Sequence, residues 1–358
     1  MNTAQTLLIP FDNYLDNRVS TTSASATNTQ DVLQSCEYLE KNPFLYGKIY
    51  NENNKDKINR MKSLKLDKIY NIDCIIGMQS IPSDSVDLVI ADPPYWKVVG
   101  EKWDYQWRTE EEYIEWSIEW IKQVSRILRK GGTFYCFGYF RTLSLLVPRL
   151  KELDLELRQQ IIIDKGMRSV SGRATKNYKM FPNVTESILF FIKDNKKFIK
   201  PFLKERQRVL NLTAKEINEA LGVKSNGGGM WSIYTGKNVC EQFPTKLCWE
   251  KLSKILQFDL PYDNIAQTYN PQMGLTDVWT DIDFYEEDRF HPTQKPLKLI
   301  SRLILASSNP EDIVLDPFSG AGSTQLAAIK HKRHYLGFEL DEEYFKIAQS
   351  RIKSSLQK

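Results

Sequence analysis

The feature that most constrains the fold is a strand–helix alternation that occupies two separate parts of the chain. Short apolar runs alternate with segments of helical periodicity between about residues 68 and 193, and again from residue 313 to residue 352. This alternation is typical of an α/β fold, in which helices cover both faces of a mostly parallel sheet. The pattern predicts strands at 68–72, 86–90, 133–137, 157–163, 187–193, 313–315 and 335–338, and helices at 74–81, 110–129, 142–153, 322–330 and 342–352.

Residues 1–60 do not follow this alternation. Residues 20–30 are rich in Ser, Thr, Ala and Asn without periodicity, and residues 51–57 are polar and charged. Composition of this kind does not support a packed core, so we expect an N-terminal extension that is partly flexible. Residues 32–41 predict a short helix within it.

Residues 204–287 also lie outside the alternation. Thr213 and Glu216 have the spacing of a capping box, which predicts a helix that ends near Gly222. Residues 212–235 loosely resemble a helix-turn-helix, but the glycines at 227–229 are a poor start for a recognition helix. A small helical insertion is an equally good interpretation.

Positive charge is concentrated in one stretch. The formal net charge is only +4, but residues 165–208 contain twelve Lys or Arg against three acids. A local basic surface of this kind suits phosphate contacts, although a solvated basic face is the plainer interpretation.

Other features exclude several classes of protein. No apolar stretch approaches the length of a membrane span, and no basic region followed by an apolar one marks a secretory signal. The five cysteines are scattered without a CxxC pair, which favours a reduced cytoplasmic protein over a disulfide framework. Three histidines without ligand spacing predict no metal site.

The sharpest motif, Asp92-Pro93-Pro94-Tyr95, follows the apolar run 86–90, at the strand end where open α/β sheets bind ligands. An exocyclic amine is a poor nucleophile because its lone pair is delocalised into the ring. Asp92 and the Pro93 carbonyl, which the proline rings orient, can accept its two N–H groups and aim the lone pair at a methyl donor. Tyr95 offers a ring on which an extruded base can stack. A Pro-rich turn with a helix-capping Asp is the plainer alternative.

A second motif, Asp316-Pro317-Phe318-Ser319-Gly320-Ala321-Gly322-Ser323-Thr324, joins a predicted strand to a helix. Its glycines let the backbone approach a ligand, and the helix N-terminus favours a carboxylate. Glu339 ends the next predicted strand, where an acid can bind ribose hydroxyls. A dinucleotide-dependent oxidoreductase shares this architecture, but its G-x-G-x-x-G fingerprint requires a glycine where Gln325 stands.

A third motif, His291-Pro292-Thr293-Gln294-Lys295-Pro296, precedes a run of helical periodicity that begins at Leu297. Thr293 or Gln294 could cap this helix, and Lys295 adds positive charge. Taken alone, the motif indicates only a loop at the start of a helix.

Aromatic and basic residues also follow the first motif, namely Trp96, Lys102, Trp103 and Trp107. They are consistent with a loop over the target base or the displaced duplex, and equally with aromatic packing under the next helix.

Together the motifs resemble those of DNA amino-methyltransferases from bacterial restriction–modification systems and their orphan relatives, over about residues 68–352. Their order resembles the circularly permuted β group, whose target-recognition region lies in the middle. The resemblance implies a Rossmann-like methyltransferase fold with a mostly parallel seven-stranded sheet and a terminal antiparallel strand. It divides the chain into the N-terminal extension 1–60, a catalytic half 61–203, a target-recognition region 204–287 and a cofactor-binding half 288–358.

The resemblance also implies S-adenosylmethionine as the cofactor and Asp92, Pro93, Pro94 and Tyr95 as the catalytic residues. Asp73 and Cys74 are similar to the family's G-D-C element, although Asn71 departs from its usual glycine. The residues implied at the cofactor are Asp73, Cys74, Asp92, His291, Pro292, Thr293, Gln294, Lys295, Asp316, Pro317, Phe318, Ser319, Gly320, Gly322, Thr324, Glu339 and Leu340.

The implied activity is site-specific methylation of adenine N6 in double-stranded DNA, by base flipping and direct in-line transfer without a metal. N4-cytosine methylation uses the same chemistry, but family members that do it more often carry Ser in place of Asp92. A dinucleotide-dependent oxidoreductase is a remote alternative, and a DNA-binding protein without activity would not need an intact first motif. A cognate restriction endonuclease and a homodimer are further partners to be tested. The predicted DNA contacts are Lys165, Arg168, Arg173, Lys176 and Lys179.

Overall fold

The computed structural model describes residues 64–96, 106–170, 179, 181–223, 229–236 and 241–357. The predicted N-terminal extension and its short helix lie outside the described residues. The chain divides into two compact units. The sheet unit comprises Ser63–Asn195 and Ile265–Lys358, and the helical unit contains Lys196–Asn264.

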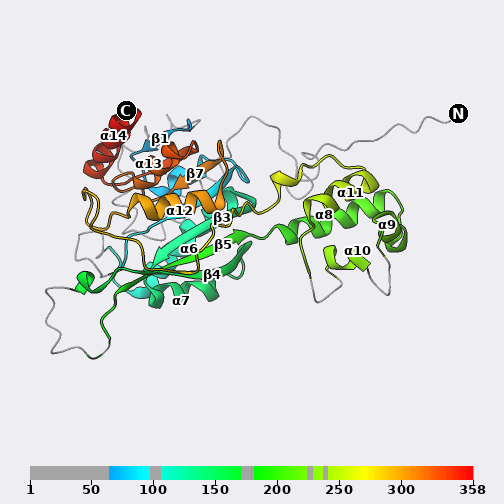
Figure 1. Cartoon of the computed structure of the whole chain (residues 1–358), viewed down its shortest axis with the longest axis horizontal. Coiled ribbons are helices and arrows are strands. Elements are labelled where there is room, and N and C mark those ends of the chain that lie inside the picture. The colour runs from blue at the N-terminus through cyan, green and yellow to red at the C-terminus, as the bar shows by residue number, and fades with distance from the viewer. Residues whose placement is uncertain are drawn as a thin grey trace. The chain divides into compact units, whose positions relative to one another are not determined.

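The sheet unit is built on a mixed, mostly parallel sheet (Figure 1). In the described residues its strand order is β1-β8-β7-β2-β3-β5-β4-β6. The strands are β1 (Lys68–Tyr70), β2 (Val86–Ala91), β3 (Leu128–Gly138), β4 (Leu155–Asp164), β5 (Thr185–Lys193), β6 (Val278–Trp279), β7 (Ile313–Asp316) and β8 (His334–Phe338).

This sheet confirms the predicted Rossmann-like α/β fold and adds two details. An eighth strand, β6, pairs with β4 at the sheet edge, and its two residues are too few for any periodicity to show in the sequence. The antiparallel strand is β5, which runs between β3 and β4 instead of at the sheet edge.

Helices cover both faces of the sheet. The described helices of this unit are α5 (Cys74–Gln79), α6 (Glu110–Ile127), α7 (Phe140–Arg149), α12 (Leu297–Ser307), α13 (Ser323–Lys330) and α14 (Glu342–Leu356). On one face, strand residues such as Leu88 share a core with Leu299 of α12 and Ala328 of α13. On the other face, Trp120 of α6 packs edge-on against Phe134 of β3, with ring centroids 5.9 Å apart.

Helix α6 follows its predicted apolar stripe but ends earlier than predicted. Thr109 caps it, and Tyr113, Trp116, Trp120 and Val124 are buried along one face. The helix ends at Ile127 instead of Arg129, because the chain turns directly into β3 and Leu128 pairs with Val86 of β2.

The central strands place two predicted motifs side by side. β2 and β7 are parallel neighbours, with Leu88 opposite Val314. From β2 the chain continues to β3 on one side, whereas from β7 it continues to β8 on the other side. Such a reversal opens a crevice at the C-terminal strand ends of an open α/β sheet. Asp92 and Asp316 both lie at those ends.

The helical unit contains α8 (Asn195–Val209, of which Asn195 belongs to the sheet unit), α9 (Ala214–Ala220), α10 (Gly229–Tyr234) and α11 (Lys246–Leu256). Its core includes Phe202 and Trp249, whose rings stack with centroids 6.3 Å apart. The predicted capping box of Thr213 and Glu216 is confirmed at the start of α9. α10 begins at Gly229 and is only six residues long. The unit overlaps the predicted recognition region over residues 204–264.

Among the helices of the described residues, none is both long and apolar enough to cross a membrane.

Candidate active site

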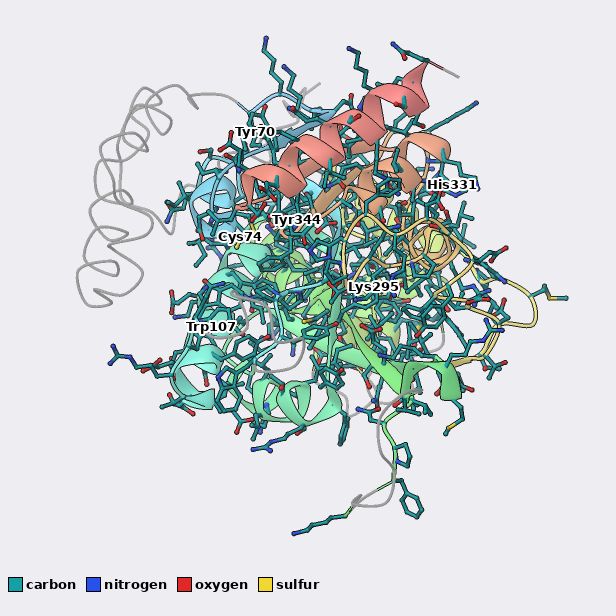
Figure 2. All side chains as sticks on the ribbon, turned by 90° about the vertical axis from the view of Figure 1, so that its left-hand side faces the viewer. Tyr70, Cys74, Trp107, Lys295, His331 and Tyr344 are labelled. Carbon is teal, nitrogen blue, oxygen red and sulfur yellow. The ribbon has the colours of Figure 1, made fainter. Side chains whose placement is uncertain are left out.

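Asp92 lies directly after β2 and makes two side-chain hydrogen bonds. One comes from its own motif and the other from a distant part of the chain. The hydroxyl of Tyr95 donates to Oδ1 at 2.8 Å, and Nζ of Lys295 donates to Oδ2 at 2.6 Å. Lys295 comes from the loop before α12 and is 6% exposed, and it lies in the interior of the sheet unit (Figure 2). The first and third predicted motifs therefore meet at Asp92.

A fourth residue, Glu186, completes this site. It is the second residue of β5. Because β5 is antiparallel to β3, it begins beside the C-terminal ends of β2 and β3. Its Oε1 lies 3.0 Å from Nζ of Lys295 and 2.9 Å from the Tyr95 hydroxyl oxygen, whose single proton can turn from Asp92 to Glu186. Its Oε2 lies 3.8 Å from Nζ of Lys165. The site thus holds two carboxylates, two ammonium groups and one phenol.

The electrostatics of the site follow from its burial. Burial raises the pKa of Asp92, the charge of Lys295 opposes that rise and the charge of Glu186 adds to it, so the net direction is upward. For Glu186, burial also raises the pKa, but Lys295 and Lys165 outweigh it and the pKa falls. Burial lowers the pKa of Lys295, but its two carboxylate neighbours raise it further, so Lys295 remains an ammonium.

The ring of Tyr95 borders a pocket. Tyr95 and Tyr139 meet edge to face, with centroids 5.3 Å apart. Pro93, Gly138 and both tyrosines line this pocket together with side chains of α6 and α7. The pocket has room for about one water molecule, and Pro93 and Tyr95, which line it, follow Asp92 in the sequence.

The second motif forms a tight turn at the end of β7. Gly320 and Gly322 have φ angles of 48° and 82°, the left-handed region that glycine adopts without strain. The backbone N–H of Gly320 donates to Oε2 of Glu339 at 2.7 Å, which joins the motif to the end of β8. Burial raises the pKa of both Asp316 and Glu339 to about 7.

These carboxyls have capacity left for a ligand. Asp316 accepts from Phe318 N at 2.9 Å, and Oε1 of Glu339 accepts from Asp341 N at 2.8 Å. A carboxylate has about four acceptor positions, so each acid retains some. At the start of α13, the buried hydroxyl of Ser323 has no hydrogen-bond partner among the described atoms. A ligand that bears hydroxyl and ammonium groups fits this set of acceptors.

Asp73 and Asn71 follow β1, where Asp73 caps a helix and Asn71 connects to the residues after β8. Asp73 caps α5, accepting from Ile75 N at 2.9 Å and from Ile76 N at 3.3 Å, and Cys74 is buried behind it. The side chain of Asn71 donates to the carbonyls of Glu339 and Leu340 at 2.9 and 3.1 Å. The residue that replaces the family's usual glycine thus connects the ends of β1 and β8.

The third motif does not cap α12 as predicted. Its N-cap is Pro296, which makes no side-chain hydrogen bond, and Oε1 of Glu287 accepts from Leu297 N at 2.9 Å instead. Gln294 stabilises the preceding loop through hydrogen bonds with Phe290 N and the Asp288 carbonyl.

The ring of His291 packs against the ring of Tyr344, and burial lowers the pKa of His291 to about 4.

The predicted DNA-binding cations differ in their surroundings. Lys165 faces Glu186 and the Tyr139 ring. Arg168 is 77% exposed and lies 4.0 Å from a carboxylate oxygen of Asp283. Lys179 is exposed, whereas Arg173 and Lys176 lie outside the described residues. β5 is antiparallel to both β3 and β4. The segment between β4 and β5 therefore starts and finishes at the end of the sheet where Asp92 lies.

Of the aromatic residues after the first motif, Trp107 packs under the next helix. It is buried, its ring meets Tyr113 edge to face with centroids 4.9 Å apart, and its carbonyl accepts from Trp96 Nε1. Lys102 and Trp103 lie outside the described residues.

Glu186 was not predicted as a site residue from the sequence. One signal was available in the sequence, because Glu186 is an acid at the start of an apolar strand. This strand follows the basic loop and begins at the end of the sheet that carries the first motif. A carboxylate in such a strand is costly to bury unless cations pair with it.

The chain is similar to known proteins over most of its length. A family model described as DNA methylase matches residues 86–350. The chain is 29% identical over 290 residues to the DNA adenine methyltransferase YhdJ of Escherichia coli strain K12, covering 78% of this chain and 80% of that protein. It is 30% identical over 297 residues to the type II methyltransferase M.BglII of Bacillus subtilis, covering 79% and 68%.

Among solved structures, a putative DNA modification methylase from Thermus thermophilus matches with a TM-score of 0.49 and 21% identity. The match covers 81% of this chain and 95% of that one. The family match spans the first motif, Glu186, the third motif and the second motif. The chain therefore belongs to the DNA methylase family, and it is a β-group amino-methyltransferase that uses S-adenosylmethionine to methylate DNA.

Proposed function

We propose that the enzyme methylates N6 of adenine in double-stranded DNA at a specific site, with Asp92, Pro93, Pro94 and Tyr95 as the catalytic residues. The Asp92 carboxylate, which lies at the C-terminal end of β2 and is held by Tyr95 and Lys295, carries this proposal. The name of the E. coli relative, a DNA adenine methyltransferase, supports adenine as the target.

The residues around the pocket would act on an adenine that has left the helix. Asp92 accepts one N–H of the amine and the Pro93 carbonyl accepts the other, which localises the nitrogen lone pair. Tyr95 stacks on the base, because a flipped base needs an aromatic partner to replace its neighbours in the duplex. Holding the amine in this orientation lowers the barrier by positioning.

S-Adenosylmethionine supplies an electrophilic methyl group on a sulfonium sulfur when it is bound. We propose that Glu339 accepts hydrogen bonds from its ribose hydroxyls and that the turn Asp316–Gly322 holds its methionine end, with Thr324 beside the turn. Asp73, Cys74 and Leu340 would border its adenine, and His291, Pro292, Thr293 and Gln294 would close over it. The acceptor positions that remain on Asp316 and Glu339 beside their backbone donors suit this ligand.

Analysis of the product decides between the two target bases. Purified enzyme is incubated with S-adenosylmethionine and unmethylated duplex DNA, and the DNA is digested to nucleosides for mass spectrometry. We expect N6-methyladenine in the wild-type reaction and none with Asp92→Ala. N4-methylcytosine as the sole product would overturn the adenine assignment, and preferential binding of NAD would overturn the cofactor assignment.

We further propose that residues 204–287 select the recognised sequence, while Lys165, Arg168, Arg173, Lys176 and Lys179 lie along the DNA path. Exchange of residues 213–249 for those of a relative should change which sites are methylated, as read by methylation-sensitive sequencing. A cognate restriction endonuclease and a homodimer are proposed partners. Light scattering on the purified enzyme tests the dimer.

A further inference from the structure

Four side chains form a closed ring of polar contacts at the active site. In order they are Asp92, Lys295, Glu186 and Tyr95, joined by contacts of 2.6, 3.0, 2.9 and 2.8 Å. Three of them belong to the motifs described above. Glu186 belongs to none and lies on β5, yet it touches two of the other members.

The hydrogen-bonding capacity of the ring shows what Glu186 contributes. The ammonium group of Lys295 has three N–H donors, and its acceptors are Asp92, Glu186 and the Thr293 carbonyl at 3.4 Å. Glu186 therefore takes one donor that would otherwise be directed at Asp92. Asp92 accepts from Lys295 and, when the single Tyr95 proton is directed at it, from Tyr95. At most two of its about four acceptor positions are used, so it can still accept an N–H from a base.

The charges of Lys295, Asp92 and Glu186 indicate the same contribution of Glu186. An ammonium group shared between two carboxylates withdraws less electron density from either one than it would from a single partner. Without Glu186, Lys295 would pair with Asp92 alone, in a buried setting where charge pairs interact strongly. A carboxylate so tightly paired is a weaker acceptor for an amine proton.

We propose that Glu186 is a positioning residue for methyl transfer, which shares Lys295 and the Tyr95 hydroxyl with Asp92 and so keeps the Asp92 carboxylate a strong acceptor for the target amine. This role rests on the function proposed above for Asp92. Glu186 acts through its neighbours and does not itself contact the base.

The pH at which Asp92 ionises gives a direct test of the role of Glu186. The groups that face Asp92 are Tyr95 on its own segment, Cys136 on β3, Glu186 on β5, Asp316 at the end of β7, and Lys295 before α12. Lys165, after β4, acts on Glu186. Among these groups, Glu186 raises the pKa of Asp92 and Lys295 lowers it.

Two substitutions should therefore move the ionisation of Asp92 in opposite directions. Glu186→Gln keeps the size of the side chain and removes its charge, so the acidic limb of the rate profile should move to lower pH. Lys295→Met removes the ammonium group, so the limb should move to higher pH. Glu186→Gln should also reduce single-turnover methyl transfer by about tenfold or more, while the Kd for S-adenosylmethionine changes little.

A second measurement needs neither DNA nor cofactor. Infrared spectra of protein labelled with ¹³C-carboxyl aspartate, taken as differences against Asp92→Asn, follow the ionisation of Asp92 itself. The same opposite shifts should appear there. Glu186→Asp, which keeps the charge, should restore part of the rate and return the titration towards that of the wild type.

Asp84→Asn is the matched control. Asp84 pairs with Lys193 at 2.6 Å and with Lys130, and it precedes β2 at the opposite sheet edge. This variant should lose stability without moving the pH limb. If Glu186→Gln behaves like Asp84→Asn, or shifts Asp92 in the same direction as Lys295→Met, the proposed role of Glu186 is wrong. A wild-type enzyme that methylates only cytosine would overturn the adenine assignment and leave this comparison decisive.

Discussion

Nζ of Lys295 lies 2.6 Å from Oδ2 of Asp92, although 203 residues separate the two along the chain. This contact brings the motif after β2 and the motif before α12 into a single buried site. It also places a permanent positive charge beside the carboxylate that we propose as the acceptor for the target amine. Several measurable consequences follow from this arrangement and from the acids around it.

Asp92→Ala should reduce methyl transfer by about 100-fold or more, because the amine loses the acceptor that localises its lone pair. Lys295 keeps Glu186 as a partner at 3.0 Å, so the loss leaves no unpaired buried ammonium and the variant should fold. Titration calorimetry should show nearly unchanged affinity for S-adenosylmethionine. Complete loss of cofactor binding in a folded variant would instead show that Asp92 acts chiefly on the cofactor, among whose contacts the family resemblance also implies it.

Glu339→Ala should weaken S-adenosylmethionine binding by about 1–3 kcal/mol, because ribose hydroxyls would lose a buried acceptor. Calorimetry measures this loss directly. Glu343→Ala, at an exposed position in the first turn of α14, provides the comparison. Equal affinities of the two variants would contradict a role for Glu339 at the cofactor.

Asp316→Asn should stabilise the ligand-free protein at high pH. The pKa of Asp316 rises on folding from its ordinary value of 3.8 to about 7, because burial disfavours the charged form. The folded state therefore holds a proton that the unfolded state has lost, and stability falls as pH rises through this window. The advantage of the variant over the wild type should grow from about pH 4 to pH 7 and level off above that, reaching on the order of 4 kcal/mol in denaturant titrations. An advantage that is independent of pH would show that Asp316 does not titrate in this range.

Neutralising Lys176 and Lys179 should weaken binding to duplex DNA of every sequence. Each lost phosphate contact should flatten the slope of log affinity against log salt by about one unit. Lys330→Ala is the control, because Lys330 is exposed at the end of α13, on the opposite edge of the sheet. If the loop variant keeps the wild-type slope while its affinity is unchanged, the basic stretch is a solvated face.

The sequence predicted most of the fold and part of the site, for physical reasons that differ between residues. Asp92 and Glu339 each directly follow a strand of strong apolar character. Parallel strands have their C-terminal ends at the same end of a sheet, so the two acids could be expected to lie near each other. The end of α6 could not, because Ile127 and Leu128 suit a helix and a strand equally well, and pairing of Leu128 with Val86 decides the boundary.

Glu186 escaped prediction because its significance depends on partners far along the chain. Nothing next to it in sequence indicates that Lys295, Lys165 and Tyr95 surround it. Likewise, the cap of α12 comes from Glu287, ten residues before Leu297, instead of from the residues adjacent to the helix. Such long-range pairings leave no periodic trace in the sequence.

The strand order has a consequence for how the protein is made. β2 and β3 emerge early from the ribosome, but β7, the other neighbour of β2, follows only after residue 313, and Ile313 N donates to Asp87 across 226 residues. Until then, the backbone N–H and C=O groups on one side of β2 lack their strand partner, and most of its side chains are apolar. Nascent chains stalled before this point should therefore depend on chaperones and aggregate readily, since an open strand edge is a template for pairing with other chains.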